Sequence, residues 1–434
     1  MATCRAPRYY LWNIGCQMNQ ADATRIAEGL ESLGYERCDR AQDADLAILN
    51  TCVVRQSAEN KVIGRLTSLS SFKRQSSQRA LLVMGCFVND LDSQKERYPY
   101  VDAFIHPSDV ESVLSFGRQW AEQRRDLSIH THPLGSVSVT EMVPISYGCD
   151  RHCTYCIVTL RRGTQRSRPI ADVQQEVRDL VARGARDITL LGQNVDAYGT
   201  DFEAGPDLAD LLIAVHDTPG LERLRFLTSH PRDMTQRIID TAASLPRLCH
   251  AWELPVQSGN DDVLRRMGRG YTADRFRDLV HRIRKATPNC AINTDVIVGF
   301  PGETEEQFAD TLELLTEVRF DVVHVAVYSP RPGTPAASWK DDVPADEKER
   351  RRKAVEELQS EIAGEINASL LGTVQEILVD GKQRGRWRGR TRTNKLVFFE
   401  AEGDWYGRLV QAHITWAGPW SMLATPIGYI SERR

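Results

Sequence analysis

Three cysteines crowd into the short segment YGCDRHCTYCIV at 147–158, with the spacing C-x3-C-x2-C. They are Cys149, Cys153 and Cys156, and they directly follow a predicted strand, VPIS. A disulfide interpretation leaves one thiol over and requires an oxidising compartment. Three thiolates on one loop can instead hold three irons of a 4Fe–4S cluster and leave the fourth iron open. Zinc is the alternative, with His152 inside the motif, but zinc sites usually pair cysteines two by two across a longer spacer.

A second set of three cysteines is spread along the first hundred residues. Cys16, Cys52 and Cys86 stand in the segments GCQMN, NTCVV and MGCFV, each at the C-terminal end of a predicted strand. The carboxyl ends of parallel strands share one edge of a sheet, where ligands bind, so we expect these thiols to converge in space. Buried cysteines that pack as small apolar residues at strand ends are the alternative.

The composition limits the kind of protein. The chain has 434 residues, 41% hydrophobic and 26% charged, which is enough for two or three domains that each bury a core. No signal-peptide core and no apolar run of membrane length is present, so the ten cysteines favour metal or redox sites in a reducing cytoplasm. The net charge of −4 excludes recruitment of nucleic acid by overall charge. We expect a cytoplasmic protein with no membrane partner.

The elements that position the cysteines fall into three regions of an α/β protein. Residues 7–124 alternate short apolar strands with helices, which predicts a small parallel α/β N-terminal domain. Residues 135–366 follow a polar linker and hold six strand–helix units, which predicts a partial TIM-type (βα)6 barrel rather than a closed eightfold one. Residues 369–432 are strand-rich and punctuated by glycines, which predicts a small C-terminal β-barrel.

Polar side chains follow the predicted strands of the partial barrel, where barrel enzymes place their catalytic groups. Such side chains can bind the polar parts of a ligand, although Ser, Asp and Asn also often cap the following helix. Gln is a poor cap, which favours a ligand for the glutamines. The candidates are Gln193, Asn194, Ser229, Gln257 and Asp295.

The glycine-rich segment GFPGET at 299–304 lacks the Lys-Ser/Thr ending of a phosphate-binding loop. It therefore predicts a tight turn from strand to helix, with Glu303 or Thr304 entering the helix. Its glycines would permit close backbone approach to a ligand.

A basic stretch, KQRGRWRGRTRTNK at 382–395, holds seven Lys or Arg and no acid. Alternate residues of a strand share one face, so its arginines would present guanidinium groups to phosphates while Trp387 stacks on a base. A solvated edge strand guarded by charge is the alternative. The candidate RNA contacts are Arg384, Arg386, Trp387, Arg388, Arg390 and Arg392.

These features together resemble a known family. C-x3-C-x2-C with an aromatic before the last cysteine is similar to the radical S-adenosylmethionine (SAM) signature. The second cysteine set, the preceding α/β domain and the small terminal barrel resemble the radical SAM methylthiotransferases over essentially the whole chain, and the terminal barrel resembles a TRAM domain. The chain most resembles the MiaB type, the tRNA-2-methylthio-N6-dimethylallyladenosine synthases, in LGQNVDAYG, LPVQSGNDDVLRRMGRGYT, TDVIVGFPGET and YSPRPGTPA. It departs from the family at TLRRG (159–163), where a Pro-Tyr-containing segment is expected.

The resemblance implies two 4Fe–4S clusters and SAM as cofactors. The first cluster, on Cys149, Cys153 and Cys156, would cleave SAM to a 5′-deoxyadenosyl radical, with Tyr155 against the adenine. The second, on the set Cys16, Cys52 and Cys86, would present the sulfur. The implied reaction adds a methylthio group to C2 of N6-dimethylallyladenosine next to the anticodon. The implied partners are tRNA, an electron donor and a sulfur-delivery protein.

Three alternative functions stay open at this point. Two are the same chemistry on threonylcarbamoyl-adenosine in tRNA or on an aspartate of a ribosomal protein, and the basic stretch disfavours the protein substrate. The third is a non-catalytic, zinc-bearing RNA-binding protein whose cysteine sets are structural. Colour separates the third from the others, because an iron–sulfur protein is brown when purified without oxygen and a zinc protein is colourless.

Overall fold

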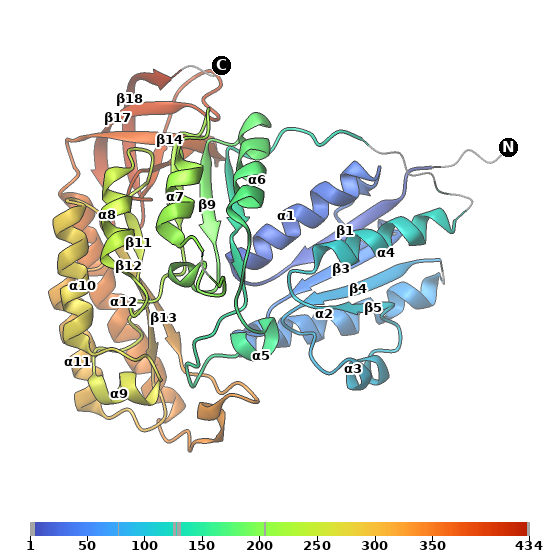
Figure 1. Ribbon diagram of the computed structural model, residues 1–434, viewed down its shortest axis with the longest axis horizontal. Helices are drawn as coiled ribbons and strands as arrows, with labels where there is room; N and C mark the ends of the chain where they lie inside the picture. The colour runs from blue at the N-terminus through green and yellow to red at the C-terminus, as the bar shows by residue number, and fades with distance from the viewer. Residues whose placement is uncertain (1–4, 77, 125–126, 128–131, 204, 432–434) are drawn as a thin grey trace. The chain divides into compact units, whose positions relative to one another are not determined.

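The computed structural model describes residues 5–76, 78–124, 127, 132–203 and 205–431 (Figure 1). The chain divides into two compact units. The first comprises residues 1–136 with the short segments 147–151 and 156–165, and the second comprises 137–146, 152–155 and 166–434. The predicted end of the terminal domain, at 432, lies outside the described residues, as does part of the predicted linker.

The first unit is built on a five-stranded parallel sheet with the order β2-β1-β3-β4-β5. Every residue of β3 and β4 is buried, as expected for central strands covered on both faces. Helices α1 and α4 share an apolar core on one face, and α2 contributes to the core on the other. The elements are β1 (Arg8–Asn13), α1 (Gln17–Ser32), β2 (Glu36–Arg37), η1 (Ala41–Asp43), β3 (Leu46–Thr51), α2 (Gln56–Gln75), β4 (Ala80–Gly85), α3 (Leu91–Arg97), β5 (Ala103–Ile105), α4 (Val110–Glu122) and α5 (Val158–Arg162). The two residues of β7 (Ser146–Tyr147) are divided between the second unit and the first.

The second unit begins with six parallel strands in two three-stranded sheets, β6-β9-β10 and β11-β12-β13. A parallel bridge between Leu224 and Leu248 links the two sheets, and one large apolar core lies between strands and helices. The elements are β6 (Thr140–Pro144), β8 (Arg166–Ser167), α6 (Ile170–Ala182), β9 (Asp187–Leu191), η2 (Val195–Ala197), α7 (Leu208–His216), β10 (Arg223–Phe226), α8 (Gln236–Ser244), β11 (Ala251–Glu253), α9 (Asp261–Arg266), α10 (Ala273–Ala286), β12 (Ala291–Val298), α11 (Glu305–Val318), β13 (Val322–Val327), η3 (Pro335–Ser338) and α12 (Ala345–Ala368).

The second unit ends in a closed five-stranded β-barrel with the order β14-β15-β16-β18-β17. Its interior is apolar, and buried arginines of β10 tie it to the six-stranded part: Arg223 donates to the carbonyl oxygen of Arg390 (2.6 Å) and pairs with Glu376 (2.8 Å). The strands are β14 (Val374–Gln383), β15 (Arg386–Thr391), β16 (Leu396–Phe399), β17 (Leu409–Ala417) and β18 (Met422–Ser431). The predicted fold class is thus confirmed in all three parts.

Candidate functional site

The three N-terminal cysteines lie at one edge of the five-stranded sheet. Cys16, Cys52 and Cys86 follow β1, β3 and β4, which are neighbours in the sheet. Cys52 and Cys86 are buried, whereas Cys16 is exposed. Burial raises the pKa of Cys52 to about 11, and Cys86 and Cys16 act in the same direction.

A buried asparagine pair fixes this edge. Asn19, in the first turns of α1, accepts from the Cys16 thiol (3.4 Å) and donates to the carbonyl oxygen of Thr51 (2.9 Å), just before Cys52. Asn50 returns a hydrogen bond to the backbone oxygen of Asn19 (2.8 Å). Because both amides are buried and hydrogen-bonded, the loops after β1 and β3 are held together.

Across the described residues, no three His, Cys, Asp or Glu side chains come close enough to hold a single metal ion. A four-iron cluster makes a different demand, because each of three thiolates binds a different iron and the sulfurs occupy separate corners.

The C-x3-C-x2-C loop directly follows β6 and β7. Cys149 and Cys153 are buried and Cys156 is partly exposed. The Cys149 sulfur accepts from the backbone N–H of Arg151 (3.4 Å). In the second unit, Thr154 donates through its N–H to the carbonyl oxygen of Met267 (3.0 Å), which fixes the middle of the loop against the end of α9.

An arginine that the sequence interpretation missed contacts this loop. Arg269 is 4% exposed, and its Nη1 lies 3.5 Å from the Cys153 sulfur and 3.5 Å from the Tyr155 hydroxyl. Its other donors are bound by the carbonyl oxygen of Pro255 (2.6 Å) and the Tyr271 hydroxyl (2.9 Å). The segment MGRGYT held the signal, but an arginine between two glycines does not by itself indicate a thiol partner.

Two predicted ligand-binding amides keep an oxygen unused. Asn194, after β9, donates through Nδ2 to Asp233 (2.7 Å), while its Oδ1 is buried without a hydrogen bond from any described residue. Gln257 follows β11, and its Oε1 is likewise buried without a hydrogen bond from any described residue. Buried polar atoms are normally paired, so these two oxygens mark a place for a ligand donor. Gln193 lies just after β9 and Asp295 within β12 rather than at its end, and both are partly exposed.

Two strand ends of the partial barrel carry backbone strain. Thr228, after β10, has a φ of 69°, and Gln257 has a φ of 73°. Side chains rarely adopt this left-handed region, and each such residue costs roughly 1–3 kcal/mol. Strain of this kind clusters at functional sites, and here it falls where ligand-binding groups were predicted.

Ser229 hydrogen-bonds a buried carboxylate. Its hydroxyl donates to Asp196 (3.0 Å), which also accepts from the backbone N–H of His230 (3.0 Å). Burial raises the pKa of Asp196 to about 7, although both hydrogen bonds act to lower it. The structure therefore gives Ser229 a role in holding the loop after β9, apart from any contact with a ligand.

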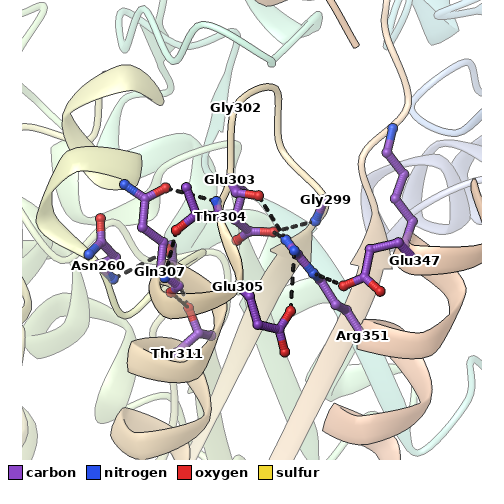
Figure 2. Close-up of polar contacts among 12 residues, drawn as sticks. Asn260, Gly299, Gly302, Glu303, Thr304, Glu305, Gln307, Thr311, Glu347 and Arg351 are labelled. Atoms are coloured by element: carbon purple, nitrogen blue, oxygen red, sulfur yellow. Dashed lines mark hydrogen bonds and ion pairs between the residues drawn. The ribbon is translucent and has the colours of Figure 1, made fainter. Parts of the chain in front are cut away.

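The GFPGET segment forms the predicted turn from β12 to α11, and Thr304 is the N-cap of α11 (Figure 2). Glu303 is buried and accepts from the N–H of Gly299 (2.6 Å) and from Arg351 of α12 (2.9 Å). Arg351 also donates to Glu347 (2.6 Å), and Figure 2 shows it reaching from α12 to Glu303. The turn is thus held by a helix that begins more than forty residues later in the sequence.

Three of the arginines predicted to contact RNA lie on β15, and the other two lie just outside it. Arg386, Arg388 and Arg390 share the outer face of β15, but Arg386 pairs with Glu400 (2.8 Å) and Arg388 with Asp380 (2.7 Å). Arg384 is exposed in the turn before β15, and Arg392 donates to the carbonyl oxygen of Leu248 (2.9 Å) in the partial barrel.

The prediction that Trp387 stacks on a base is wrong. Trp387 is 8% exposed, lies in the apolar core of the terminal barrel and donates to the carbonyl oxygen of Ala401 (3.1 Å). Because side chains alternate along a strand, outward-facing arginines on either side direct the tryptophan inward.

Sequence profiles of three families match the chain. The Radical SAM superfamily matches residues 143–315, the Uncharacterized protein family UPF0004 matches 8–106 and the TRAM domain matches 368–427. The tRNA-2-methylthio-N(6)-dimethylallyladenosine synthase of Herpetosiphon aurantiacus is 46% identical over 427 residues, covering 97% of this chain and 98% of that protein. That of a Roseiflexus species is 47% identical over 427 residues, covering 97% and 90%. This chain belongs to the tRNA-2-methylthio-N(6)-dimethylallyladenosine synthase family.

Solved structures share the fold of this synthase-family chain. TsrM, a radical SAM methyltransferase from Kitasatospora setae solved with cobalamin and a [4Fe-4S] cluster, superposes with a TM-score of 0.57 and covers 87% of this chain and 82% of its own. At 14% sequence identity the likeness concerns the fold alone. No helix among the described residues has the length and apolar character to cross a membrane.

Membership of the radical SAM superfamily implies a 4Fe–4S cluster and SAM, and the residues present fit both. The unused oxygens of Asn194 and Gln257 are acceptors, which suits the ammonium and hydroxyl donors of SAM. Tyr155 lies edge-on to Phe300 of the GFPGET turn, with ring centres 6.4 Å apart.

Glu303→Gln is expected to destabilise the partial barrel by roughly 2–3 kcal/mol, because it leaves the Arg351 guanidinium buried without its main partner. Glu347 and Glu305 keep the loss below that of an isolated buried pair. Thermal unfolding measures the effect. The control Glu305→Gln removes an exposed carboxylate and should change stability by less than about 1 kcal/mol. Equal midpoints for the two variants would contradict the clamp.

Asp196→Asn is expected to remove a pH dependence of stability. The pKa of Asp196 in the folded protein, about 7, lies above that of an exposed aspartate. The folded state therefore binds the proton more tightly than the unfolded state does. The contribution of this carboxyl to the free energy of unfolding is complete below about pH 4 and is lost as the pH rises to 7. Each pKa unit is worth about 1.4 kcal/mol, so wild type should lose roughly 2–3 kcal/mol relative to the variant between pH 5 and 7. Parallel unfolding curves of the two proteins across this range would show that Asp196 titrates normally.

Proposed function

We propose that this protein adds a methylthio group to C2 of N6-dimethylallyladenosine next to the anticodon of tRNA. The observation that carries the proposal is the pair of three-cysteine sets, one on the loop after β6 and β7 and one at the edge of the N-terminal sheet, in a chain similar to the synthases over its full length. The names of those relatives favour this substrate over threonylcarbamoyl-adenosine and a ribosomal protein. Two clusters also account for the cysteines better than a zinc-bearing module does.

The partial barrel would hold the radical chemistry. An aromatic C2–H is neither acidic nor electrophilic enough for ordinary acid–base or nucleophilic attack, and the cluster with SAM supplies radical chemistry when bound. Cys149, Cys153 and Cys156 would be its ligands. Arg269 holds Cys153 and Tyr155 in place, because all its other donors are fixed on the barrel.

The strand-end amides would orient the cofactor. Asn194 and Gln257 present acceptor oxygens, and their backbones are fixed: Gln257 donates to the carbonyl oxygen of Asp295 (2.8 Å) and accepts from Ile297 (3.0 Å). Gln193 and Asp295 would complete this set. An oriented cofactor is what makes the reaction selective, since a radical attacks whichever bond is nearest.

The N-terminal unit would hold the second cluster on Cys16, Cys52 and Cys86. Their placement at neighbouring strand ends, the buried asparagine pair behind them and the match of residues 8–106 to the UPF0004 family support this. Sulfur for the methylthio group would be delivered from this cluster, with an electron donor and a sulfur-delivery protein as further partners.

The terminal barrel would bind the tRNA through the outer face of β15. Arg386, Arg388 and Arg390 present guanidinium groups there, and their acidic partners are Asp380 on β14 and Glu400 directly after β16. RNA phosphates must compete with these carboxylates. The face therefore suits binding that positions the RNA without a very high affinity.

Cys52→Ala is expected to separate the two halves of the reaction. The variant should still form 5′-deoxyadenosine from SAM, because that step needs only the barrel cluster, but should make no methylthiolated tRNA. Cys153→Ala should form neither. Iron content should fall from about eight to about four per chain in each variant. Mass spectrometry of the nucleosides and iron analysis measure these outcomes.

A normal yield of methylthiolated tRNA from Cys52→Ala would show that the N-terminal cysteines only pack in the core and hold no cluster needed for the reaction. Wild-type formation of 5′-deoxyadenosine by Cys153→Ala would show that the barrel loop does not hold the reacting cluster.

Replacing Arg386, Arg388 and Arg390 together by alanine is expected to weaken tRNA binding while SAM cleavage without tRNA is unchanged. Each lost phosphate contact should lower the slope of log affinity against log salt by about 0.7–0.9. The matched control, Asp380→Asn with Glu400→Gln, frees the same arginines and should tighten binding. Titration of labelled tRNA at several salt concentrations measures both, and unchanged slopes would leave the outer face of β15 as a solvated charged surface of a strand that is paired on both sides.

A further inference from the structure

A buried arginine lies beside the N-terminal cysteines, and it comes from the segment that follows the barrel loop. Arg162 is the last residue of α5, which begins two residues after Cys156. Residues 156–165 pack with the N-terminal unit, and Ile157 belongs to its apolar core. Arg162 itself is 9% exposed.

The guanidinium of Arg162 is oriented by neutral groups. Its Nη2 donates to Oδ1 of Asn19 (3.0 Å) and its Nη1 to the Ser108 hydroxyl (2.8 Å). The same Asn19 oxygen accepts from the Cys16 thiol (3.4 Å). Burial raises the pKa of the Cys86 thiol, and the charge of Arg162 acts against that rise. Arg162 therefore acts on two of the three cysteines, on Cys16 through Asn19 and on Cys86 through its charge.

Neutralisation of a buried carboxylate is the simpler role for Arg162. Asp22 is 1% exposed and shares the Ser108 hydroxyl with the arginine (3.0 Å). However, both guanidinium bonds given above go to neutral oxygens rather than to Asp22, and one of these oxygens belongs to the residue that holds Cys16. The arginine is placed for the cysteine edge as well as for the carboxylate.

We propose that Arg162 is a positioning residue for a cluster on Cys16, Cys52 and Cys86, whose negative charge it stabilises and whose reduction potential it raises. The inference rests on the proposed function, which supplies the second cluster. The potential of an iron–sulfur cluster depends on nearby charge, and Arg162 supplies a buried positive charge that is fixed by Asn19 and Ser108. Asp22 would act in the opposite direction.

The test uses the full chain with Cys149, Cys153 and Cys156 replaced by alanine, so that only the N-terminal set can hold a cluster. Anaerobic reconstitution with iron and sulfide should give about four irons per chain. An EPR-monitored titration with dithionite then gives the midpoint potential of the cluster. Circular dichroism checks that each variant is folded.

Arg162→Gln in this background should lower the equilibrium constant for reduction of the cluster about tenfold. For one electron this is a shift of the midpoint potential by about 59 mV to more negative values. Arg162→Lys keeps the charge and should shift it less. Asp22→Asn should shift it to more positive values. Arg40→Gln removes a 74% exposed arginine of the same unit and should leave it unchanged.

A potential of Arg162→Gln equal to that of Arg40→Gln, with the cluster present, overturns the inference and leaves the proposed function intact. Loss of iron from folded Arg162→Gln, with iron retained by Arg40→Gln, supports it. If Arg162→Gln does not fold, the sign of the Asp22→Asn shift decides, and a negative or zero shift overturns the inference. A background protein that binds no iron contradicts the second cluster itself, and the inference with it.

Discussion

Thiolates that bind iron carry negative charge into the protein, and charge removed from water needs a partner close by. Two buried arginines stand beside cysteines: Arg269 lies against Cys153, and Arg162 donates to the Asn19 oxygen that accepts from Cys16. Oxygens of the surrounding residues hold both guanidinium groups, those of Pro255 and Tyr271 for Arg269 and those of Asn19 and Ser108 for Arg162. The arginines are thereby fixed before any cluster is present, and they favour the anionic form of the site.

The turn after β12 depends on a similar buried ion pair, between Glu303 and Arg351. The helix that carries Arg351 also contacts the terminal barrel of the second unit. Arg351 of α12 holds Glu303, and near the other end of the same helix Asn367 donates to the carbonyl oxygen of Gly418 in the terminal barrel (2.8 Å). A helix of 24 residues is about 36 Å long. One rigid element thus links the turn beside Tyr155 to the barrel proposed to hold RNA.

The sequence was sufficient for the features that depend on local spacing. The strands before Cys16, Cys52 and Cys86 and the six strands of the partial barrel were predicted from apolar runs, and the structure has them at those places. The turn at Glu303 followed from its glycines. The partners of these residues did not follow, because Arg269, Arg162 and Arg351 meet them only through the folding of distant segments. Neither did the short β2 strand, which has only two residues.

The terminal barrel shows where a local rule was applied incompletely. The alternation that places Arg386 and Arg388 on the outer face also requires Trp387 to point inward, and the structure has it there. Phosphate contacts position RNA without reading its bases, so the β15 face by itself distinguishes no sequence. The exposed indoles of this barrel are elsewhere, at Trp416 (51% exposed) and Trp420 (58%). A base that stacked on an exposed indole of the barrel would therefore do so at Trp416 or Trp420 rather than at the buried Trp387 between the β15 arginines.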